Sequence, residues 1–313
     1  MEPSGLLESF RRYLEKSKSP HTARLYYRSV RDFVEWAARR GYSLDRLTAL
    51  AISDWQEELL GRLSPRSVDA MSAALKTFFR AMGRYDLAMA VPSVRYEARP
   101  IDWLEEPEVI RVIEAGETPL EQAVLATGYE LALRVGEVPL LQRDWFSYEL
   151  RQCRVQRLKR KGAVPTYDTL PMRPYFADKL RAYLETREDS APPMFVAGKS
   201  LASGRPRPIS VGMVNYIYRK AARKVGGKAR RLTWHAFARH SRITNYAIEM
   251  LRESGKVDLF RLMKLAGHVS EKSTLVYVHM ATSWFYAHAL SLIHISEPTR
   301  PRLISYAVFC LKK

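Results

Sequence analysis

The stretch LMKLAGHVSEKSTLVYVHM, Leu262 to Met280, sets a histidine and a tyrosine nine residues apart. The histidine follows one short apolar run, and the tyrosine lies within a second. The first run is expected to form a helix that stops at Gly267, and polar residues 270–274 supply a turn before the second run. This pattern can present His268 and Tyr277 to one cleft. It also fits a plain helix-turn-helix whose histidine and tyrosine are ordinary half-buried residues. The rest of the chain has to decide between the two interpretations.

The overall composition indicates a protein that meets a polyanion. The chain has 313 residues, 47% of them hydrophobic, which suits one large or two modest domains. Its 51 Lys and Arg outnumber 33 Asp and Glu, giving a net charge of +18, as is typical of nucleic-acid-binding proteins. No apolar run is long enough to span a bilayer, and the N-terminus lacks the order of a signal peptide. We therefore expect a soluble, intracellular protein whose leading partner is nucleic acid.

The sequence gives no reason to expect a metal or another cofactor. Only Cys153 and Cys310 are present, too few for a disulfide framework or a cysteine zinc site. The histidines do not cluster with carboxylates at the usual ligand spacings.

The last segment of the chain has an unusual composition. LSLIHISEPTR, residues 290–300, resembles the translation of a sequencing-library transposon adapter, and ISYAVFCLKK, residues 304–313, resembles the flow-cell primer that follows it. A genuine apolar tail would not explain two consecutive matches in one frame. We interpret residues 290–313 as adapter readthrough that is not native, and leave them out of the fold prediction.

Residues 1–92 are expected to form a helical DNA-binding domain. Amphipathic helical periodicity runs over residues 6–16, 22–40 and 51–62, and a Ser-Pro pair at 64–65 opens a further helix. Residues 93–102 form a linker in which the periodicity lapses. The outer faces of the helices carry basic side chains that are either simply solvated or contact phosphates. These are Arg24, Arg28, Arg31, Lys76 and Arg80.

The following domain, residues 103–289, begins with helical patterns that lead to an arginine. A long apolar helix is expected over residues 120–133 and runs straight into Arg134. An arginine beside almost unbroken apolar sequence is expected to be partly buried, so it must be paired or aimed at a ligand. Glu137, three residues later, is the candidate for a simple pair.

The periodicity then changes to that of a β-hairpin. Residues 152–158 and 164–170 are expected to be two strands, joined by a basic turn that holds Lys161. A solvated lysine at a hairpin tip is common, so Lys161 is a weak signal by itself. Helices resume over residues 175–188 and 211–225, and Thr233 can cap a later helix. That helix carries His235, Arg239, His240 and Arg242.

Five motifs, taken in order, resemble the tyrosine recombinases, also called the phage integrase family, of the two-domain Xer-like type. They are Arg134 in ALRVGEV, Lys161 in the hairpin KG, the helix HAFARH, His268 in LAGH, and Tyr277 in STLVYVHM.

The resemblance covers residues 6–288 and implies a mainly α fold. It implies an N-terminal helical core-binding (SAM-like) domain and a mostly helical catalytic domain with a small antiparallel β-sheet. It also implies a partner, double-stranded DNA with a specific recombination site, and a homo-tetramer on paired sites that the altered C-terminus could impair. The expected location is the cytoplasm, in association with the nucleoid.

The chemistry of these residues agrees with the resemblance. Breaking a phosphodiester without a metal needs a covalent nucleophile, cations for the non-bridging oxygens and an acid for the leaving oxygen. Because a phosphotyrosine conserves the bond energy, a 5′ hydroxyl can reverse the step without ATP. The resemblance implies that Tyr277 is the nucleophile that forms a 3′-phosphotyrosine and that Arg134 and Arg239 bind the non-bridging oxygens. It also implies that Lys161 protonates the 5′ oxygen and that His268 donates a hydrogen bond to the phosphate. His235 would assist proton transfer at the tyrosine.

One spacing departs from the family pattern. The family usually places its histidine three residues before the second arginine, whereas His235 and Arg239 are four apart. On an α-helix the extra residue rotates the histidine by about 100° relative to the arginine. Either the helix begins after His235 and a loop absorbs the residue, or that base is lost and the enzyme is slow. Arg242 is a less favoured substitute for Arg239.

Several other functions remain open at this point. One alternative is a catalytically impaired DNA-binding protein of the same fold. Another is a type IB topoisomerase-like enzyme, which uses similar chemistry but only relaxes DNA. A non-catalytic DNA-binding module fits the charge, but it does not explain why Arg134, Lys161, His268 and Tyr277 occur together.

Overall fold

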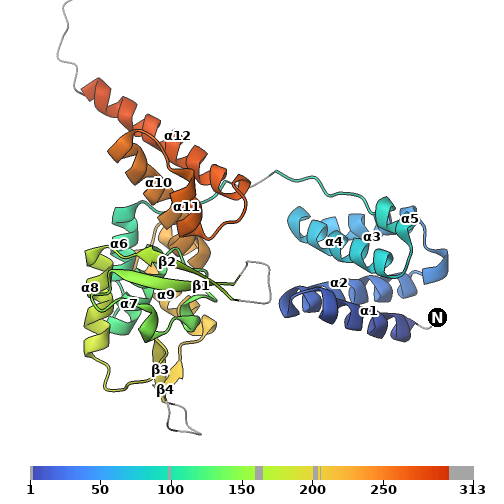
Figure 1. Cartoon of the computed structure of the whole chain (residues 1–313). Coiled ribbons are helices and arrows are strands. Elements are labelled where there is room, and N and C mark those ends of the chain that lie inside the picture. Colours follow the sequence, from blue (N-terminus) through green and yellow to red (C-terminus); the bar gives the residue numbers. More distant parts are fainter. Residues whose placement is uncertain (1–2, 98–99, 159–164, 200–203, 205, 296–313) are drawn as a thin grey trace, which may run out of the picture. The chain divides into compact units, whose positions relative to one another are not determined.

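The chain is mainly α-helical and falls into two compact units. The computed structural model describes residues 3–97, 100–158, 165–199, 204 and 206–295. The units are Met1–Arg99 and Pro100–Lys313 (Figure 1). None of the described helices combines the length and the apolar character needed to cross a membrane. The predicted fold class is confirmed.

The first unit is a helical bundle. Its described helices are α1 (Pro3–Ser17), α2 (Pro20–Arg39), α3 (Ala49–Leu60), α4 (Pro65–Ala81) and α5 (Tyr85–Ala90), with a 3₁₀ turn at Leu44–Arg46. Ser19 and Ser64 cap α2 and α4, since each hydroxyl accepts a bond from a backbone N–H of the first turn and is followed by proline. Phe33 and Trp55 meet edge to face in the core, with ring centroids 5.1 Å apart. These local signals account for the agreement with the predicted helices.

The second unit opens with two helices, a hairpin and a third helix. These are α6 (Glu106–Glu114), α7 (Pro119–Glu130), the antiparallel strands β1 (Gln152–Arg157) and β2 (Thr166–Pro171), and α8 (Pro174–Glu185). Val155 lies opposite Asp168 in the register of the hairpin. The basic turn predicted between the strands, which holds Lys161, lies outside the described residues.

Helix α7 ends at Glu130, so the predicted helix over residues 120–133 is wrong at its C-terminal end. The helix closes with a Schellman motif, in which Leu133 N–H bonds to Gly128 O at 2.9 Å and Ala132 N–H bonds to Tyr129 O at 2.9 Å. This motif needs a positive φ, and Ala132 supplies it at 49°. Because Ala132 occupies a position where glycine is usual, the sequence carries no residue that signals the end of this helix. The chain therefore turns just before Arg134.

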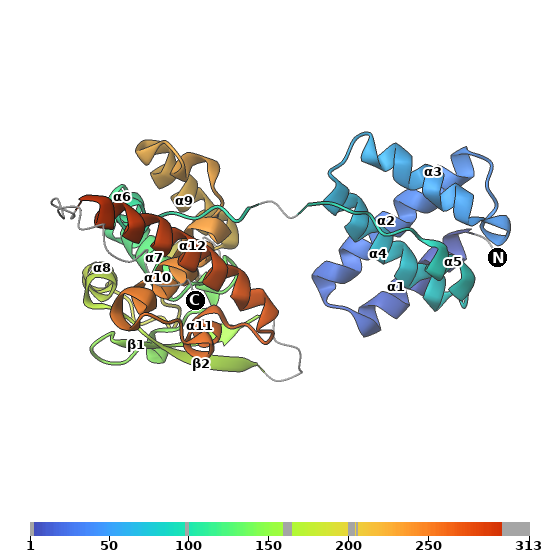
Figure 2. The ribbon, with the colours of Figure 1, turned by 90° about the horizontal axis from the view of Figure 1, so that it is seen from above.

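The remaining elements complete the second unit. A second antiparallel pair is formed by β3 (Val196–Lys199) and β4 (Pro206–Pro208). The later helices are α9 (Val211–Val225), α10 (Ser241–Ser254), α11 (Leu259–Ala266) and α12 (Lys272–Ile295). Helix α12 continues past residue 290, where the segment interpreted as adapter readthrough begins. Helices α10, α11 and α12 pack against one another (Figure 2). Helix α11 ends at Gly267, whose φ of 58° confirms the predicted stop.

Candidate active site

Arg134 lies in a turn and is tied to a buried carboxylate. Its Nη1 donates to Glu137 Oε1 at 2.9 Å, and its backbone N–H donates to Oε2 of the same group at 2.9 Å. The Arg134 side chain is 14% exposed, while that of Glu137 has no exposure. The simple pair that the sequence suggested is therefore present. Glu137 also faces a second guanidinium, since its Oε2 lies 3.6 Å from Arg157 Nη1.

Arg157, at the end of β1, joins the hairpin to α11. Its side chain is fully buried, and its Nε donates to Asp168 Oδ2 at 3.0 Å. Its Nη2 donates to Leu265 O at 2.9 Å. No sequence motif marks Arg157, although strand alternation places it on the same face as the buried Cys153 and Val155. Arg157 holds the C-terminal end of α11, from which His268 follows, close to Glu137.

The motif HAFARH forms a π turn, His235–His240, at the start of α10. Trp234 already has helical dihedral angles, and Phe237 N–H bonds to Thr233 O, so the helix begins before His235. A loop therefore does not absorb the extra residue. Instead, Ser241 N–H bonds to Ala236 O, five residues back, which is the hydrogen bond of a π turn. The extra residue lies inside this wider turn, so the rotation of about 100° expected on an α-helix does not apply.

Trp234 fixes the π turn against the segment that carries Arg134. Its indole ring packs on Gly128, where a Cβ atom would lie 2.3 Å from Cζ2 of the ring. Its Nε1–H donates to Leu133 O at 3.0 Å. A glycine in the last turn of α7 is therefore required by close packing. The π turn and Arg134 are positioned by the same contact.

Arg239 is a buried cation beside Arg134. It is 1% exposed, its Nη1 donates to Ala132 O at 3.0 Å, and its Nη2 donates to Ala266 O. No carboxylate in the described part of the chain lies within ion-pair distance of it. Burial, with Arg134 nearby, lowers the pKa of Arg239 to about 9, so it stays protonated at neutral pH. A buried cation bonded only to carbonyls can recruit an anion.

Tyr277, on α12, points its hydroxyl at a histidine of the π turn. Its side chain is buried, and Oη lies 2.7 Å from His240 Nδ1. Burial raises the pKa of Tyr277, while Arg239 and Arg134 act in the opposite direction. His235 packs edge-on against the His240 ring, with ring centroids 4.6 Å apart. From the sequence, His240 was expected on this helix but had no predicted role.

His268 completes the cluster. Its ring stacks on that of Tyr277 at 6.0 Å between centroids, and its Nδ1 lies 3.0 Å from Thr274 Oγ1. Burial, with Arg239 nearby, lowers the pKa of His268 to about 4, so the ring is neutral at pH 7. When the threonine hydroxyl donates to Nδ1, the proton of the neutral ring is on Nε2 and free to serve as a donor.

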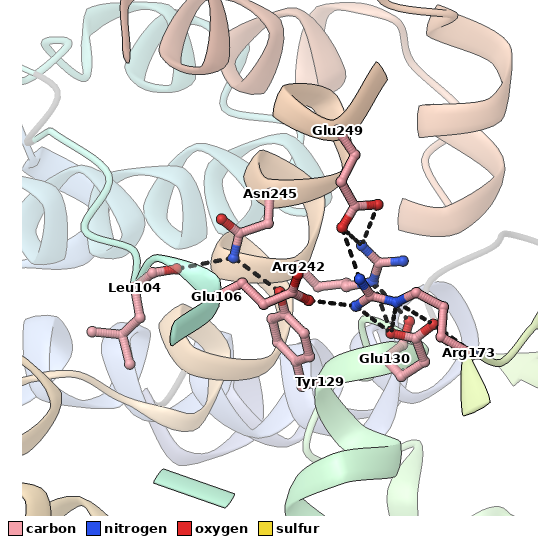
Figure 3. Close-up of polar contacts among 8 residues, drawn as sticks. All are labelled: Leu104, Glu106, Tyr129, Glu130, Arg173, Arg242, Asn245 and Glu249. Carbon is pink, nitrogen blue, oxygen red and sulfur yellow. Dashed lines mark hydrogen bonds and ion pairs between the residues drawn. The ribbon is translucent and has the colours of Figure 1, made fainter. Parts of the chain in front are cut away.

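Arg242, the alternative to Arg239, belongs to a separate cluster (Figure 3). Its Nε lies 3.3 Å from Glu130 Oε2, and its Nη1 lies 3.2 Å from Glu249 Oε1. Arg173 also pairs with both of these glutamates, at 2.8 and 2.9 Å, and with Glu106. Arg242 is therefore engaged with carboxylates that join α7, α8 and α10.

The structure brings four of the six predicted site residues together, Arg134, Arg239, His268 and Tyr277. His235 joins them through its ring contact with His240, and Lys161 lies outside the described residues. A tyrosine hydroxyl held by histidine beside two arginines, in a helical unit that follows a smaller helical unit, defines a class of phosphodiester-cleaving enzyme.

Two family models match the chain in this order. The phage integrase N-terminal SAM-like domain matches residues 7–84, and the phage integrase family matches residues 102–283. The chain belongs to the phage integrase family. The resemblance inferred from the five motifs is confirmed, and with it the class of enzyme, the tyrosine recombinases.

Relatives and solved structures agree with this membership. The tyrosine recombinase XerA of Thermococcus kodakarensis is 28% identical over 279 residues, which cover 88% of this chain and 91% of that protein. The tyrosine recombinase XerC of Mycobacterium tuberculosis is 26% identical over 296 residues, which cover 89% of this chain and 95% of that protein. The fold is similar to that of the XerH site-specific recombinase bound to a palindromic difH substrate, with a TM-score of 0.67, 16% identity and coverage of 87% and 80%. The fold is also similar to that of a lambda integrase dimer bound to a COC′ core site, with a TM-score of 0.65 and 15% identity. The match covers 89% of this chain and 77% of that chain.

Proposed function

We propose that this protein is a site-specific recombinase that cuts and rejoins double-stranded DNA through a 3′-phosphotyrosine, without metal or ATP. The observation that carries the proposal is the position of Tyr277, whose hydroxyl lies 2.7 Å from an imidazole nitrogen. Arg134 and Arg239 both act electrostatically on this tyrosine, and both favour its ionised form. Membership of the phage integrase family supports the same chemistry.

The two arginines are suited to bind the scissile phosphate. Among the described residues, Arg239 bonds only to carbonyl oxygens and Arg134 shares its carboxylate with Arg157, so this cluster has an excess of positive charge. A phosphate would offset that charge and would also draw Tyr277 towards ionisation as it attacks.

Two further residues act on the oxygens of the phosphate in this proposal. His268, neutral and with its proton on Nε2, donates a hydrogen bond to a non-bridging oxygen. Lys161 is the acid that protonates the leaving 5′ oxygen, a role that rests on the family resemblance.

The first unit provides a surface for the DNA backbone. A groove of about 720 Å³ between α1 and α2 is lined partly by Lys18, Arg24 and Tyr27, and by Arg11, whose charge is partly offset by Glu15. Of the predicted basic faces, Arg28 and Arg31 are partly offset by acidic neighbours on α2, whereas Arg24 and Arg80 are exposed and show no ion pair among the described residues. We assign phosphate contacts to this groove and to Arg80.

Assembly and location follow from the same function. A lambda integrase tetramer bound to a Holliday junction is among the structures with a similar fold. We propose that this protein acts as a homo-tetramer on paired recombination sites, in the cytoplasm and associated with the nucleoid.

The test is the formation of a covalent adduct. A DNA site is first selected from a random duplex library by binding to the protein, and a nicked duplex with that site is then incubated with the enzyme. We expect a protein–DNA adduct on a denaturing gel, lost in Tyr277→Phe and kept in Tyr286→Phe. Tyr286 lies on the same helix but is 61% exposed, so it is the matched control. An adduct that persists in Tyr277→Phe, or none from the wild type, contradicts the proposal.

A second assay separates strand exchange from simple relaxation. A plasmid with two copies of the selected site is compared with a supercoiled plasmid that lacks the site. Recombinant products from the first plasmid support a recombinase. Relaxation of the second plasmid without recombination of the first would identify a topoisomerase-like enzyme instead.

A further inference from the structure

The hydroxyl of the proposed nucleophile lies 2.7 Å from Nδ1 of His240, the residue that directly follows Arg239, whereas the family resemblance assigned proton transfer to His235. We propose that His240 takes the proton of Tyr277 as the tyrosine attacks DNA, and returns it when the phosphotyrosyl bond breaks. This inference rests on the proposed function, because it requires Tyr277 to be the nucleophile. On this assignment His235 is a positioning residue that supports the His240 ring.

The geometry fits a general base. His240 Nδ1 lies 2.7 Å from Tyr277 Oη, within the reach of about 2.6–3.2 Å that direct proton transfer requires. With the imidazole proton on Nε2, Nδ1 is the acceptor and the tyrosine hydroxyl is the donor. The two rings are tilted by 32°, with centroids 5.7 Å apart.

The π turn explains how two histidines come to share this site. On an α-helix the neighbouring side chains are three or four residues apart, and residues five apart diverge by about 140°. A π turn closes its hydrogen bonds over five residues, so His235 and His240 become neighbours. Their rings accordingly meet edge to face at 4.6 Å between centroids.

Burial, together with a nearby positive charge, keeps His240 neutral and able to accept a proton. His240 faces Arg239 and His235 on its own segment, Tyr277 on α12, and His268 before that helix. Burial, with Arg239 nearby, lowers the pKa of His240 to about 4. A phosphate bound to Arg239 would offset that cation, so the imidazole becomes a stronger base once DNA is in place.

The proton and electron transfers balance in both directions. As Tyr277 Oη bonds to phosphorus, its proton moves to His240 Nδ1, and the bond between phosphorus and the 5′ oxygen breaks. The 5′ oxygen leaves with the electron pair and takes a proton from the acid, which is Lys161 in the proposed function. When a 5′ hydroxyl attacks the phosphotyrosine, its proton passes to the deprotonated Lys161 as its oxygen bonds to phosphorus. The bond between phosphorus and Oη then breaks, and His240 gives its proton back to Oη.

The first test uses the free protein. The chain has seven histidines, so a ¹⁵N-histidine NMR spectrum is simple, and the His240 signals are assigned by their loss in His240→Gln. We expect a neutral His240 with its proton on Nε2 between pH 5 and 8, and a shift of its Nδ1 signal by several ppm in Tyr277→Phe. A ring protonated on Nδ1, or signals unchanged in Tyr277→Phe, would overturn the assignment.

The second test measures the rate of adduct formation on the selected nicked duplex, and on a version with sulfur replacing the bridging 5′ oxygen. His240→Gln should slow the rate by about 10²–10⁴-fold on both substrates, since a sulfur leaving group needs no acid and does not rescue a defect at the tyrosine. His235→Gln should lose about tenfold or less. The exposed His279 on α12 provides a control, and His279→Gln should react at the wild-type rate.

The outcomes separate the two proposals. A normal rate in His240→Gln, or a larger loss in His235→Gln than in His240→Gln, overturns the role of His240 while leaving the recombinase intact. Rescue of His240→Gln by the sulfur substrate places its defect at the leaving group and also overturns the role. A wild type that forms no adduct overturns the proposed function itself.

Discussion

The guanidinium of Arg157 lies against the Cα of Gly267 so closely that a side chain at position 267 would displace it. A Cβ atom there would lie 2.8 Å from Arg157 Nε and 2.9 Å from its Cδ. Gly267 also has a φ of 58° as it ends α11. One glycine thus both closes the helix before His268 and lets Arg157 reach the carbonyl of Leu265.

Replacing this glycine should therefore lower the free energy of unfolding by more than the strain of a positive φ alone would. Gly267→Ala is expected to lower the free energy of unfolding by about 2–4 kcal/mol, from left-handed strain and displacement of a buried arginine. Gly255→Ala is the control, because Gly255 ends α10 with a φ of 71° but has open space around it. In urea titrations of both variants, Gly255→Ala should lose about 1–2 kcal/mol of unfolding free energy. Equal losses in the two variants would contradict a role for the Arg157 contact.

Arg157 itself should be one of the most sensitive positions in the second unit. Arg157→Met leaves the carboxylate of Glu137 with one cation and removes two hydrogen bonds to the end of α11, so we expect a loss of about 3–5 kcal/mol. Arg154 is on the exposed face of the same strand, where it stacks on Tyr167 and shows no ion pair within the described part of the chain. Arg154→Met should lose less than about 1 kcal/mol. Similar denaturation midpoints for the two variants would argue against this difference.

The parts of the fold that the sequence predicts well are those with local causes. Ser19 and Ser64 cap helices with their own side chains, and Gly267 ends α11 because glycine adopts a positive φ easily. The end of α7 could not be predicted in this way. Ala132 takes up the same conformation without being glycine, and only the packing of the whole unit can hold it there.

The residues of the site also differ in whether local sequence predicts their place in it. Sequence order and spacing were enough to group Arg134, Arg239, His268 and Tyr277, since each lies in a recognisable motif. The role of His240 depends on a π turn, which no local residue preference distinguishes from an α-helix. The extra residue could be counted in the sequence, but its structural accommodation could not.

Arg239 and Arg242 lie three residues apart and should respond oppositely to substitution. Arg242→Met leaves Glu130 and Glu249 short of a cation in a buried cluster, so a loss of about 3–5 kcal/mol in unfolding free energy is expected. In Arg239→Met the loss of two carbonyl hydrogen bonds is offset by removal of a buried cation, so the change should stay within about 1 kcal/mol. Adduct formation should nevertheless disappear in Arg239→Met. A folded Arg242→Met of wild-type stability would contradict this.

Acid should destabilise the protein through two partly buried histidines. The pKa values of His240 and His268 are lowered to about 4 in the folded chain, against an ordinary value of 6.5, with burial as the main cause. Between these values the unfolded chain binds protons that the folded chain does not, so stability falls as the pH falls from 6.5 to 4. Urea titrations at several pH values should show a shallower fall in a His240→Gln, His268→Gln double variant. The difference cannot exceed about 1.4 kcal/mol per pH unit for each histidine, and parallel curves would contradict the prediction.

The π turn offers a test of how the extra residue is tolerated. An insertion into an α-helix rotates everything beyond it by about 100°, whereas a π turn takes up the residue and leaves both flanks in register. Deleting Ala236 should therefore convert the turn to an α-helix without moving Trp234 from Gly128 or Arg239 from its carbonyls. We expect this variant to fold with a Tm within about 3 °C of the wild type, a change of about 1 kcal/mol. Deleting Ala247, buried in the regular helix α10, should instead abolish cooperative unfolding, because the rotation has no π turn to absorb it. If the two deletions are equally damaging, the π turn is not the device that keeps the motif in register.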